Sequence, residues 1–516
     1  TTAIDCSAAA DVFFSMEALI GVFQLDASDN AILRVSTNGG TDWTAFTLFP
    51  NLTTAERWSE NSFLSSVDIS SVAAGEAAVL LQIQWTGGWE YFMAIDDIVL
   101  TSEDPRPANS MRVNQFAAVA PNVRTPFSQV EPIGFIADIE NIGSGDQTNV
   151  TLTISVTDDA TGTEVFSDML DYGDVASDEL AENVFFENEF TPAAMPANYT
   201  ATYALNYDNL ADDAEPANTT RSFPIIITDS VFSKSIDATR SVAPAADNSF
   251  SYGNTYYVNN ATDPVSGEPL LGKSITFGMS NPDDIAGQSL TAFLYEWDGD
   301  TNDDFLANQD EYQPVGFASY MVEGGEGNAL ITVPLESLTG DVIMLQEDKH
   351  YIAAVQYADE TNTTFFLLAS EEFDYAAMNF YTDSLMRQRF AGALDVSNEG
   401  EFSMIGFGLD IVPVVRLNIG IETIIDATEP QLPKGAVQAF PNPADKFVNV
   451  DFDLQEPTSG TMTLISAKGQ ILQTQELENV MSDRIRVDTA ELPSGMYIIR
   501  IDTEQGVSNR PISVQH

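Results

Sequence analysis

Hydrophobic and polar residues alternate over short runs along much of this chain. In "VTLTISVTD", Leu152, Ile154 and Val156 alternate with threonine and serine, and "NYTATYALNYD" repeats the same period. A period of two places alternate side chains on one face of a strand, so each run predicts a strand with one buried face. Between two further β-like runs, the turn residues "NGG" at 38–40 predict a hairpin. The pattern therefore predicts an all-β protein.

Turn-rich and proline-rich passages divide the strands into blocks. "TSEDPRPANS" interrupts the pattern after the first block, and "IETIIDATEPQLPKG" interrupts it before the last. The 516 residues are too many for one core, and a hydrophobic content of 44% leaves ample material to bury. We therefore predict tandem β-sandwich domains over residues 1–103, 107–228, 229–425 and 437–516.

The charge balance narrows the classes of partner. There are 78 acidic and 20 basic residues, for a net charge of −58. Such a field repels nucleic acids and anionic membranes, so neither is an expected partner. It keeps a protein soluble in salt, and it leaves open cation binding at particular acidic loops. No segment approaches the roughly 20 apolar residues that a membrane span requires.

Residues for nucleophilic or metal chemistry are scarce. The lone cysteine, Cys6, rules out an intramolecular disulfide and a thiolate cluster, and its context predicts a small buried residue. The two histidines are His350, at the start of an apolar run, and His516, the last residue. We therefore predict no catalytic residue and no histidine-based metal site.

The last 80 residues carry motifs in a fixed order: "FPNPADKFVNVDF", "LISAKGQIL", "LPSGMYIIRI" and "ISVQ". On pattern alone they predict a small β-sandwich. They also closely resemble the type A C-terminal sorting domain of the Bacteroidota type IX secretion system. The resemblance implies export through the type IX translocon to the cell surface or the medium, and in that family the module is commonly removed after export.

The first block resembles the jelly-roll adhesin modules of type IX cargo, related in plan to MAM-like domains, through "VSTNGGTDWTAF" and "FMAIDDIVL". The resemblance implies calcium near Asp96 and Asp97, carboxylates that interrupt an apolar run. The match begins partway through such a module. We expect its early strands to come from upstream sequence or, by strand addition, from a neighbouring molecule, which would make the protein a homo-oligomer or polymer.

The other inner blocks have weaker resemblances. Residues 107–228 resemble Ig-like spacer domains of the CARDB type, and residues 229–425 have the size of a second jelly roll. The N-terminus lacks the basic and apolar regions of a signal peptide, so we expect a removed leader or more sequence upstream.

A second calcium candidate lies in "WDGDTNDDFLANQDEY". Asp298, Asp300, Asn302 and Asp304 alternate as oxygen ligands do in calcium loops. Asp303 stands where an EF-hand has glycine, so this is not an EF-hand. The alternative is an acidic hairpin loop on an acidic protein.

Two further kinds of site are predicted. Trp85 and Trp89 flank a Thr-Gly-Gly turn and could stack on sugars, as could Trp297, although tryptophan in a sandwich is more often core. Ser230 and Ser384 lie in Asp-Ser-apolar triplets that resemble the Bacteroidota O-glycosylation motif.

Together these features favour a non-enzymatic secreted or cell-surface protein that acts in adhesion or in an extracellular assembly, with calcium as its possible cofactor. Two alternatives stay open: the accessory C-terminal portion of a secreted hydrolase, and an array of glycan-binding modules.

Overall fold

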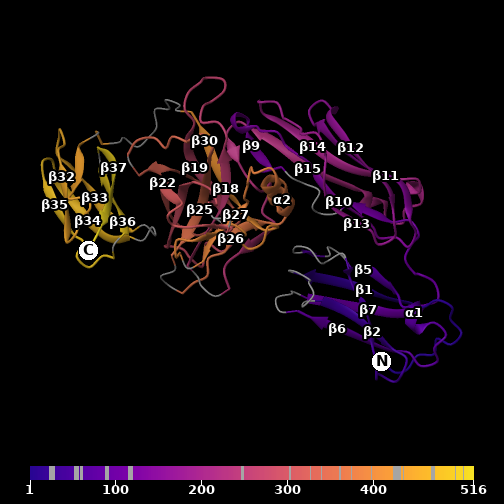
Figure 1. Cartoon of the computed structure of the whole chain (residues 1–516). Helices are drawn as coiled ribbons and strands as arrows, with labels where there is room; N and C mark the ends of the chain where they lie inside the picture. The colour runs from indigo at the N-terminus through magenta and orange to yellow at the C-terminus, as the bar shows by residue number, and fades with distance from the viewer. Residues whose placement is uncertain are drawn as a thin grey trace.

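Strands dominate the structure, a computed structural model, and gather around four separate large hydrophobic cores (Figure 1). We call the strands around each of these cores a module and keep the residue bounds predicted from the sequence as its label. The prediction of an all-β fold is confirmed. In the part of the chain that the structure describes, the helices are α1 (Ser70–Ala73), α2 (Ala376–Ser384) and the 3-10 turns η3 (Phe127–Gln129), η4 (Leu210–Asp212) and η5 (Pro216–Thr219). The described residues are 1–22, 30–50, 57–58, 62–87, 92–113, 120–245, 249–301, 304–325, 327–338, 340–358, 362–373, 375–396, 398–421, 432–433, 435–466, 471–493, 495–503 and 505–516.

The first module (residues 1–103) is a sandwich of two sheets. One sheet holds β4 (Arg57–Trp58), β1 (Phe13–Val22), β5 (Phe63–Asp68) and β7 (Phe92–Thr101), and the other holds β3 (Thr44–Thr47), β2 (Asn30–Ser36) and β6 (Leu80–Thr86). Alternate residues of β1, including Phe14 and Met16, face the core between the sheets. Strand β7 pairs with β1 and lies at the edge of its sheet.

The second module (residues 107–228) shows why the alternating runs form strands. Its sheets are β13 (Leu180–Phe185), β10 (Ile136–Asn141) and β8 (Met111–Val113), and β12 (Thr163–Val175), β11 (Gln147–Asp158), β14 (Ala197–Asn206), β15 (Thr220–Thr228) and β9 (Arg124–Pro126). Ile154 of β11 lies opposite Tyr203 of β14, and both are fully buried. The intervening threonines face outward, as a period of two requires.

The third module (residues 229–425) is built on an eight-stranded sheet, ordered β21 (Leu306–Ala307), β28 (Phe402–Ser403), β27 (Gly392–Val396), β18 (Phe250–Val258), β25 (Lys349–Tyr357), β20 (Ser289–Trp297), β22 (Tyr312–Met321) and β24 (Glu336–Ser337). Smaller sheets lie beside it: β16 (Val231–Phe232), β30 (Val415–Gly420), β19 (Leu271–Gly278) and β23 (Leu330–Pro334), and β17 (Arg240–Val242), β26 (Leu367–Ser370) and β29 (Val412–Pro413).

Strand β20 of the third module contributes to two cores. Leu290 and Leu294 point into the main core of the module. Phe293 and Trp297 point to the opposite face of the sheet, into a second core. Burial on both faces explains why "LTAFLYEW" reads as a continuous apolar run and not as an alternation.

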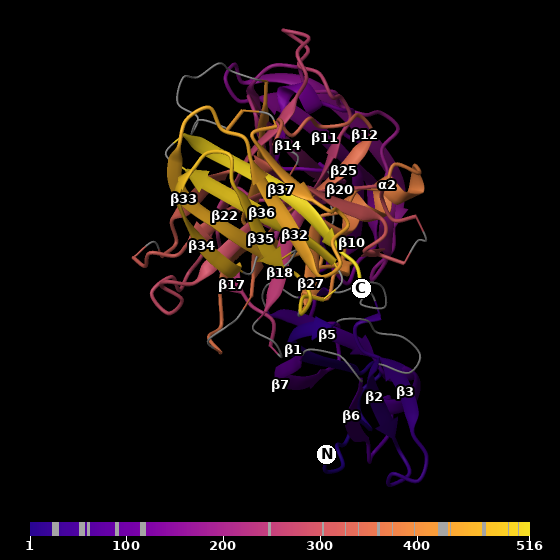
Figure 2. The same cartoon turned by 90° about the vertical axis from the view of Figure 1, so that its left-hand side faces the viewer.

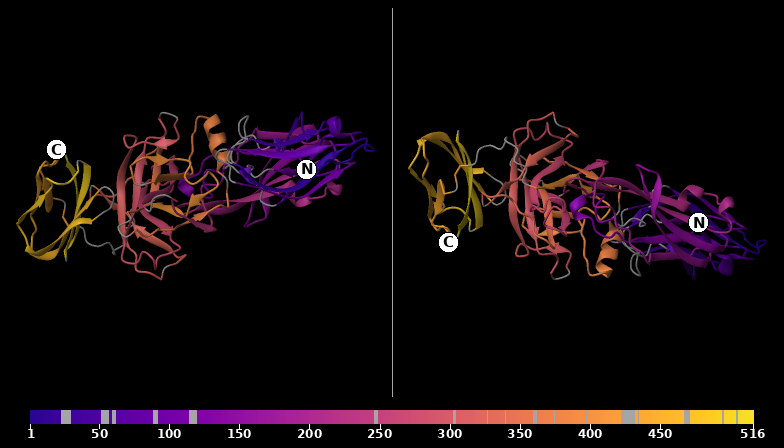
Figure 3. Two further views of the ribbon diagram at one scale, coloured as in Figure 1. Left: turned by 90° about the horizontal axis from the view of Figure 1, so that it is seen from below. Right: turned by 90° about the horizontal axis from the view of Figure 1, so that it is seen from above.

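The fourth module (residues 437–516) has its sheets in the order β31 (Val437–Phe440), β32 (Phe447–Phe452) and β35 (Arg484–Asp488), and β34 (Ile471–Val480), β33 (Thr458–Ser466), β36 (Gly495–Thr503) and β37 (Gly506–Val514). It lies at one end of the molecule and the first module at the other, with the third module between them (Figure 3). Seen from the fourth-module side, the first module projects away from the other three (Figure 2).

Candidate functional site

The fourth module has a core of its own and a second apolar face. Tyr497, Ile499 and Ile501 of β36 point into that core, together with Val448 and Val450 of β32. The intervening residues of β36 point the other way, because successive side chains of a strand face opposite sides of the sheet. The module can therefore bury one face internally and offer the other to a neighbour.

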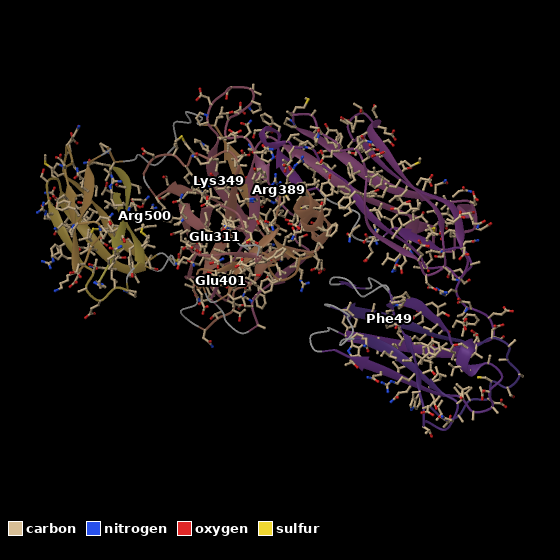
Figure 4. The ribbon with its side chains drawn as sticks, viewed as in Figure 1. Phe49, Glu311, Lys349, Arg389, Glu401 and Arg500 are labelled. Carbon is tan, nitrogen blue, oxygen red and sulfur yellow. The ribbon has the colours of Figure 1, made fainter. Side chains whose placement is uncertain are left out.

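That second face contacts the third module. Ile465 and Ile498 are buried in the second core of the third module. Beside them, the carboxylate of Glu336 on β24 accepts hydrogen bonds from Arg500 and from Asn509 Nδ2, the latter at 2.6 Å. Arg500 lies at the border of the two modules, where its side chain reaches the third module (Figure 4).

Residues 438–515 match the secretion system C-terminal sorting domain family. The fourth module is a type IX sorting domain. The resemblance predicted from its motifs is thus confirmed, and the chain is a type IX cargo, exported to the cell surface or the extracellular space. Among the described residues, no helix is long and apolar enough to cross a membrane.

Comparison with solved structures gives similarities too low to support an argument. A biofilm-associated protein BSP domain has 11% identity and a TM-score of 0.14, with 79% of this chain and 81% of that chain covered. Dimeric latent PorU of Porphyromonas gingivalis has 12% identity and a TM-score of 0.13, with 79% and 34% covered, so the match spans about a third of PorU. No curated protein sequence matches the chain.

The predicted calcium residues of the first module lie on the edge strand β7. Asp96 and Asp97 are exposed, and the N–H of Asp97 donates to Asp96 Oδ1 at 2.8 Å. Asp97 has a φ of 48° in a bulge, and Asp96 lies directly opposite Glu17 of β1. The carboxylates of Asp96 and Glu17, directly opposite each other on paired strands, repel each other. A bound cation would relieve this repulsion. Calcium at this position stays a prediction.

The predicted sugar platform is only half inside the described residues. Trp85 of β6 is half-buried and packs against the core of the first module. Trp89 lies outside the residues that the structure describes. The expectation that Trp297 could stack on a sugar is wrong, because its side chain is fully buried between Phe390 and His350 in the second core of the third module.

The carboxylates of the acidic loop of the third module bind partners within the protein, namely Lys349 and the backbone of the loop itself. Asp298 forms an ion pair with Lys349. Asp300 accepts the N–H groups of Asp304, at 3.1 Å, and Phe305, at 2.8 Å. Asp304 in turn accepts the N–H of Leu306. Asn302, the fourth predicted ligand, lies outside the described residues.

Sequence reasoning missed the carboxylate that organises this loop. Glu311 is buried and accepts hydrogen bonds from Thr301 and from the N–H of Asn308 at 3.0 Å. Burial alone would raise the pKa of Glu311, but these hydrogen bonds outweigh it and lower that pKa below its ordinary value. Within the described residues, no group of three or more His, Cys, Asp or Glu side chains could hold a metal ion. A calcium ion here would need ligands beyond such a group, and the site stays a prediction.

The predicted glycosylation sites differ in accessibility. Ser384 is exposed at the end of α2, and its hydroxyl donates to the carbonyl of Tyr381 at 2.7 Å. Ser230 is half-buried, and its carbonyl accepts the N–H of Ile419. Modification of either serine stays a prediction.

The joint between the second and third modules is the feature that sequence reasoning missed most completely. Helix α2 lies between the two modules (Figure 1), and its Tyr381 packs on Gly134 and Ile136 of the second module. A Cβ at position 134 would lie 1.7 Å from the Tyr381 hydroxyl, so any larger residue there would displace the Tyr381 ring. Phe380 of the same helix stacks on Phe185, with ring centroids 6.0 Å apart.

Charged groups also cross this joint. Arg389 of the third module binds Glu131 of the second at 2.8 Å. The buried Lys234 donates from Nζ to the carbonyl of Pro121 at 2.6 Å. Burial, reinforced by the charge of Arg389, lowers the pKa of Lys234 to about 7. The two modules are therefore held by apolar and polar contacts together.

Proposed function

We propose that this type IX cargo is a non-enzymatic protein of an extracellular adhesive or structural assembly. The observation that carries the proposal is the position of the modules: the sorting domain and the first module lie at opposite ends (Figure 3), and interfaces join the second, third and fourth modules. A molecule so built displays its first module away from its sorting domain.

The state of the reactive side chains supports a non-enzymatic role. Burial raises the pKa of the Cys6 thiol, with the charge of Asp5 adding to the effect, so the thiol is protonated at neutral pH. The ring of His350 contacts Tyr257 and Trp297, and His516 lies at the exposed C-terminus beside Asp445. None of these three groups contacts another of them, so they do not form a nucleophile and base pair.

Strand β7 of the first module supports assembly by strand addition. Its Ile95, Ile98 and Val99 are exposed, and in the described residues only β1 pairs with it. Proteins usually protect such an edge with lysine or proline, and β7 has neither. Its two aspartates and bulge keep the edge soluble but leave the apolar run 98–100 beyond them. We assign this edge to a strand of a second copy of the chain.

Sedimentation of the purified chain tests the assembly. We expect species above the monomer mass that grow with concentration over the micromolar range. Val99→Lys should return the chain to monomer, because a charge on the edge opposes pairing. Val165→Lys is the matched control: Val165 is 46% exposed, against 47% for Val99, and lies on the edge strand β12 of the second module.

Two outcomes would count against the proposal. A chain that stays monomeric at every concentration would remove strand addition. Hydrolysis of a peptide or polysaccharide substrate by the native protein recovered from its cells would instead favour the reading of this chain as the accessory portion of a secreted hydrolase.

A further inference from the structure

A cleft of about 830 Å³ opens at the joint between the second and third modules. Phe127 and Pro192 of the second module line one side, and Tyr257, His350 and Gln388 of the third line the other. Clefts of roughly 300–1,000 Å³ at domain interfaces are the common setting of small-molecule sites. The neighbouring Arg389 is labelled at this joint in Figure 4.

Several polar groups that line the cleft have acceptors or donors to spare. In the described part of the chain, the ring nitrogens of His350 and the side-chain amide of Gln388 have no hydrogen-bond partner. Asn259 donates from Nδ2 to the carbonyl of Gln129 at 3.3 Å, and its Oδ1 has no donor in the same residues. Each of these groups can therefore bind a ligand without breaking an existing bond.

The imidazole of His350 is held in place by aromatic rings. Tyr257 and Trp297 lie 4.9 Å and 5.3 Å from it, centroid to centroid, and Phe390 lies 6.1 Å away. Burial, reinforced by the charge of Arg389, lowers the pKa of His350 to about 3. At neutral pH the ring is uncharged, with one nitrogen as donor and the other as acceptor.

The charges beside the cleft are already paired. Arg389 binds Glu131 and lies 3.6 Å over the ring of Tyr257, and Arg387 is 3.6 Å from Glu189. Asp348 accepts the Tyr257 hydroxyl at 2.9 Å. With both arginines next to carboxylates, and with a net charge of −58 on the chain, a polyanion gains little here and is repelled at a distance.

We propose that this cleft binds a neutral oligosaccharide. Sugar hydroxyls both donate and accept, which matches the uncharged imidazole and the carboxamides of Gln388 and Asn259. The C–H faces of a sugar ring match the apolar surfaces of the half-buried Phe127 and the exposed Met386. The site differs from the tryptophan platform of the first module and does not depend on strand addition.

The test begins with an array of neutral and uronate-containing oligosaccharides, followed by calorimetric titration of the strongest neutral binder. We expect Gln388→Leu and His350→Phe each to weaken binding about fivefold to tenfold, since each removes one or two hydrogen bonds. Gln475→Leu is the control, because Gln475 is equally half-buried but lies on β34 of the sorting domain. Melting curves of all three variants check the fold, and Gln388→Leu decides alone if His350→Phe does not fold.

Four results would overturn the proposal. No neutral oligosaccharide binds; or one binds equally well to wild type and to Gln388→Leu; or the uronate-containing sugars bind most tightly. Neutral-sugar binding that is lost on Trp85→Ala and kept in the cleft variants would also overturn it, and would place the sugar on the first module.

Discussion

The two joints of the third module are built differently. The joint with the second module uses an inserted helix, an aromatic stack, an ion pair and a buried lysine. The joint with the sorting domain lays one sheet face against another and centres on Ile465, Ile498 and the carboxylate of Glu336. The sorting domain keeps its own core apart from this contact, so we expect it to separate from the third module without unfolding. The second module cannot leave without exposing α2.

Tyr381→Ala should have the largest effect on this contrast. Tyr381 is buried against Ile136 and fills the space above Gly134, so its loss leaves a cavity at the joint. We expect the free energy of unfolding to fall by about 3–5 kcal/mol, as it does when other large aromatic side chains are truncated to alanine. Calorimetry should show this fall in the unfolding transition of the second and third modules. Phe380→Ala on the same helix should cost much less, because the Phe380 side chain is 47% exposed. Equal losses would show that Tyr381 contributes no more to the joint than Phe380 does.

Glu336→Ala should open the other joint. The change leaves Arg500 and the buried Asn509 without their shared carboxylate, at a cost of about 1.5–3 kcal/mol to docking. Small-angle scattering should show a larger radius of gyration for the variant, while the melting temperature of the sorting domain stays unchanged. Glu323→Ala, an exposed acid of the same module, is the control. An unchanged radius would mean that the apolar contact alone holds the sorting domain.

Lys234→Met should strengthen the joint between the second and third modules. The pKa of Lys234 is lowered from 10.5 to about 7, so between these values the unfolded chain binds more protons than the folded one. The free energy of unfolding therefore rises with pH from about 7 to 10.5. Below pH 7 the buried charge of Lys234 lowers it by the full amount. Methionine removes the charge, and we expect a gain on the order of 2 kcal/mol at pH 6 and a weaker pH dependence from 7 to 10. The exposed Lys446→Met should change neither, and an unaltered pH profile in Lys234→Met would contradict the assignment.

Chelation of calcium should have the smallest effect and should leave both joints unchanged. If Asp96 and Asp97 hold an ion, it stabilises the first module by about 1.4 kcal/mol when free calcium is tenfold above Kd. We expect EDTA to lower the melting temperature of that module by a few degrees. In Asp96→Asn the melting temperatures with and without EDTA should be the same. Identical melting with and without EDTA would eliminate calcium as a structural ion at both predicted sites.

The sequence predicted the features that depend on neighbours along the chain. The alternation at Leu152, Ile154 and Val156 sufficed for a strand with one buried face, and these three side chains are fully buried. The sorting domain could be recognised because its motifs stand in a fixed order over 80 residues. The domain boundaries, the calcium sites and the serine sites stay predictions.

The acidic loop shows where such reasoning stops. Its alternating acids indicated ligands for a cation, yet Asp300 and Asp304 accept N–H groups of the loop itself. Glu311, outside the alternation, is the buried member. A spacing rule identifies carboxylates but does not tell whether a backbone or an ion satisfies them, because both offer positive charge at similar distances.

By itself, the sequence determined the all-β fold, the sorting domain and its route of export, since period and motif order are local properties. Only the tertiary structure decided how the modules join. Glu131 and Arg389 are 258 residues apart, and His350 acquires its aromatic neighbours from three other strands and segments. Such contacts form when strands far apart in the chain pair and when separate modules pack. No local pattern encodes which distant side chain will complete a charge or line a cleft.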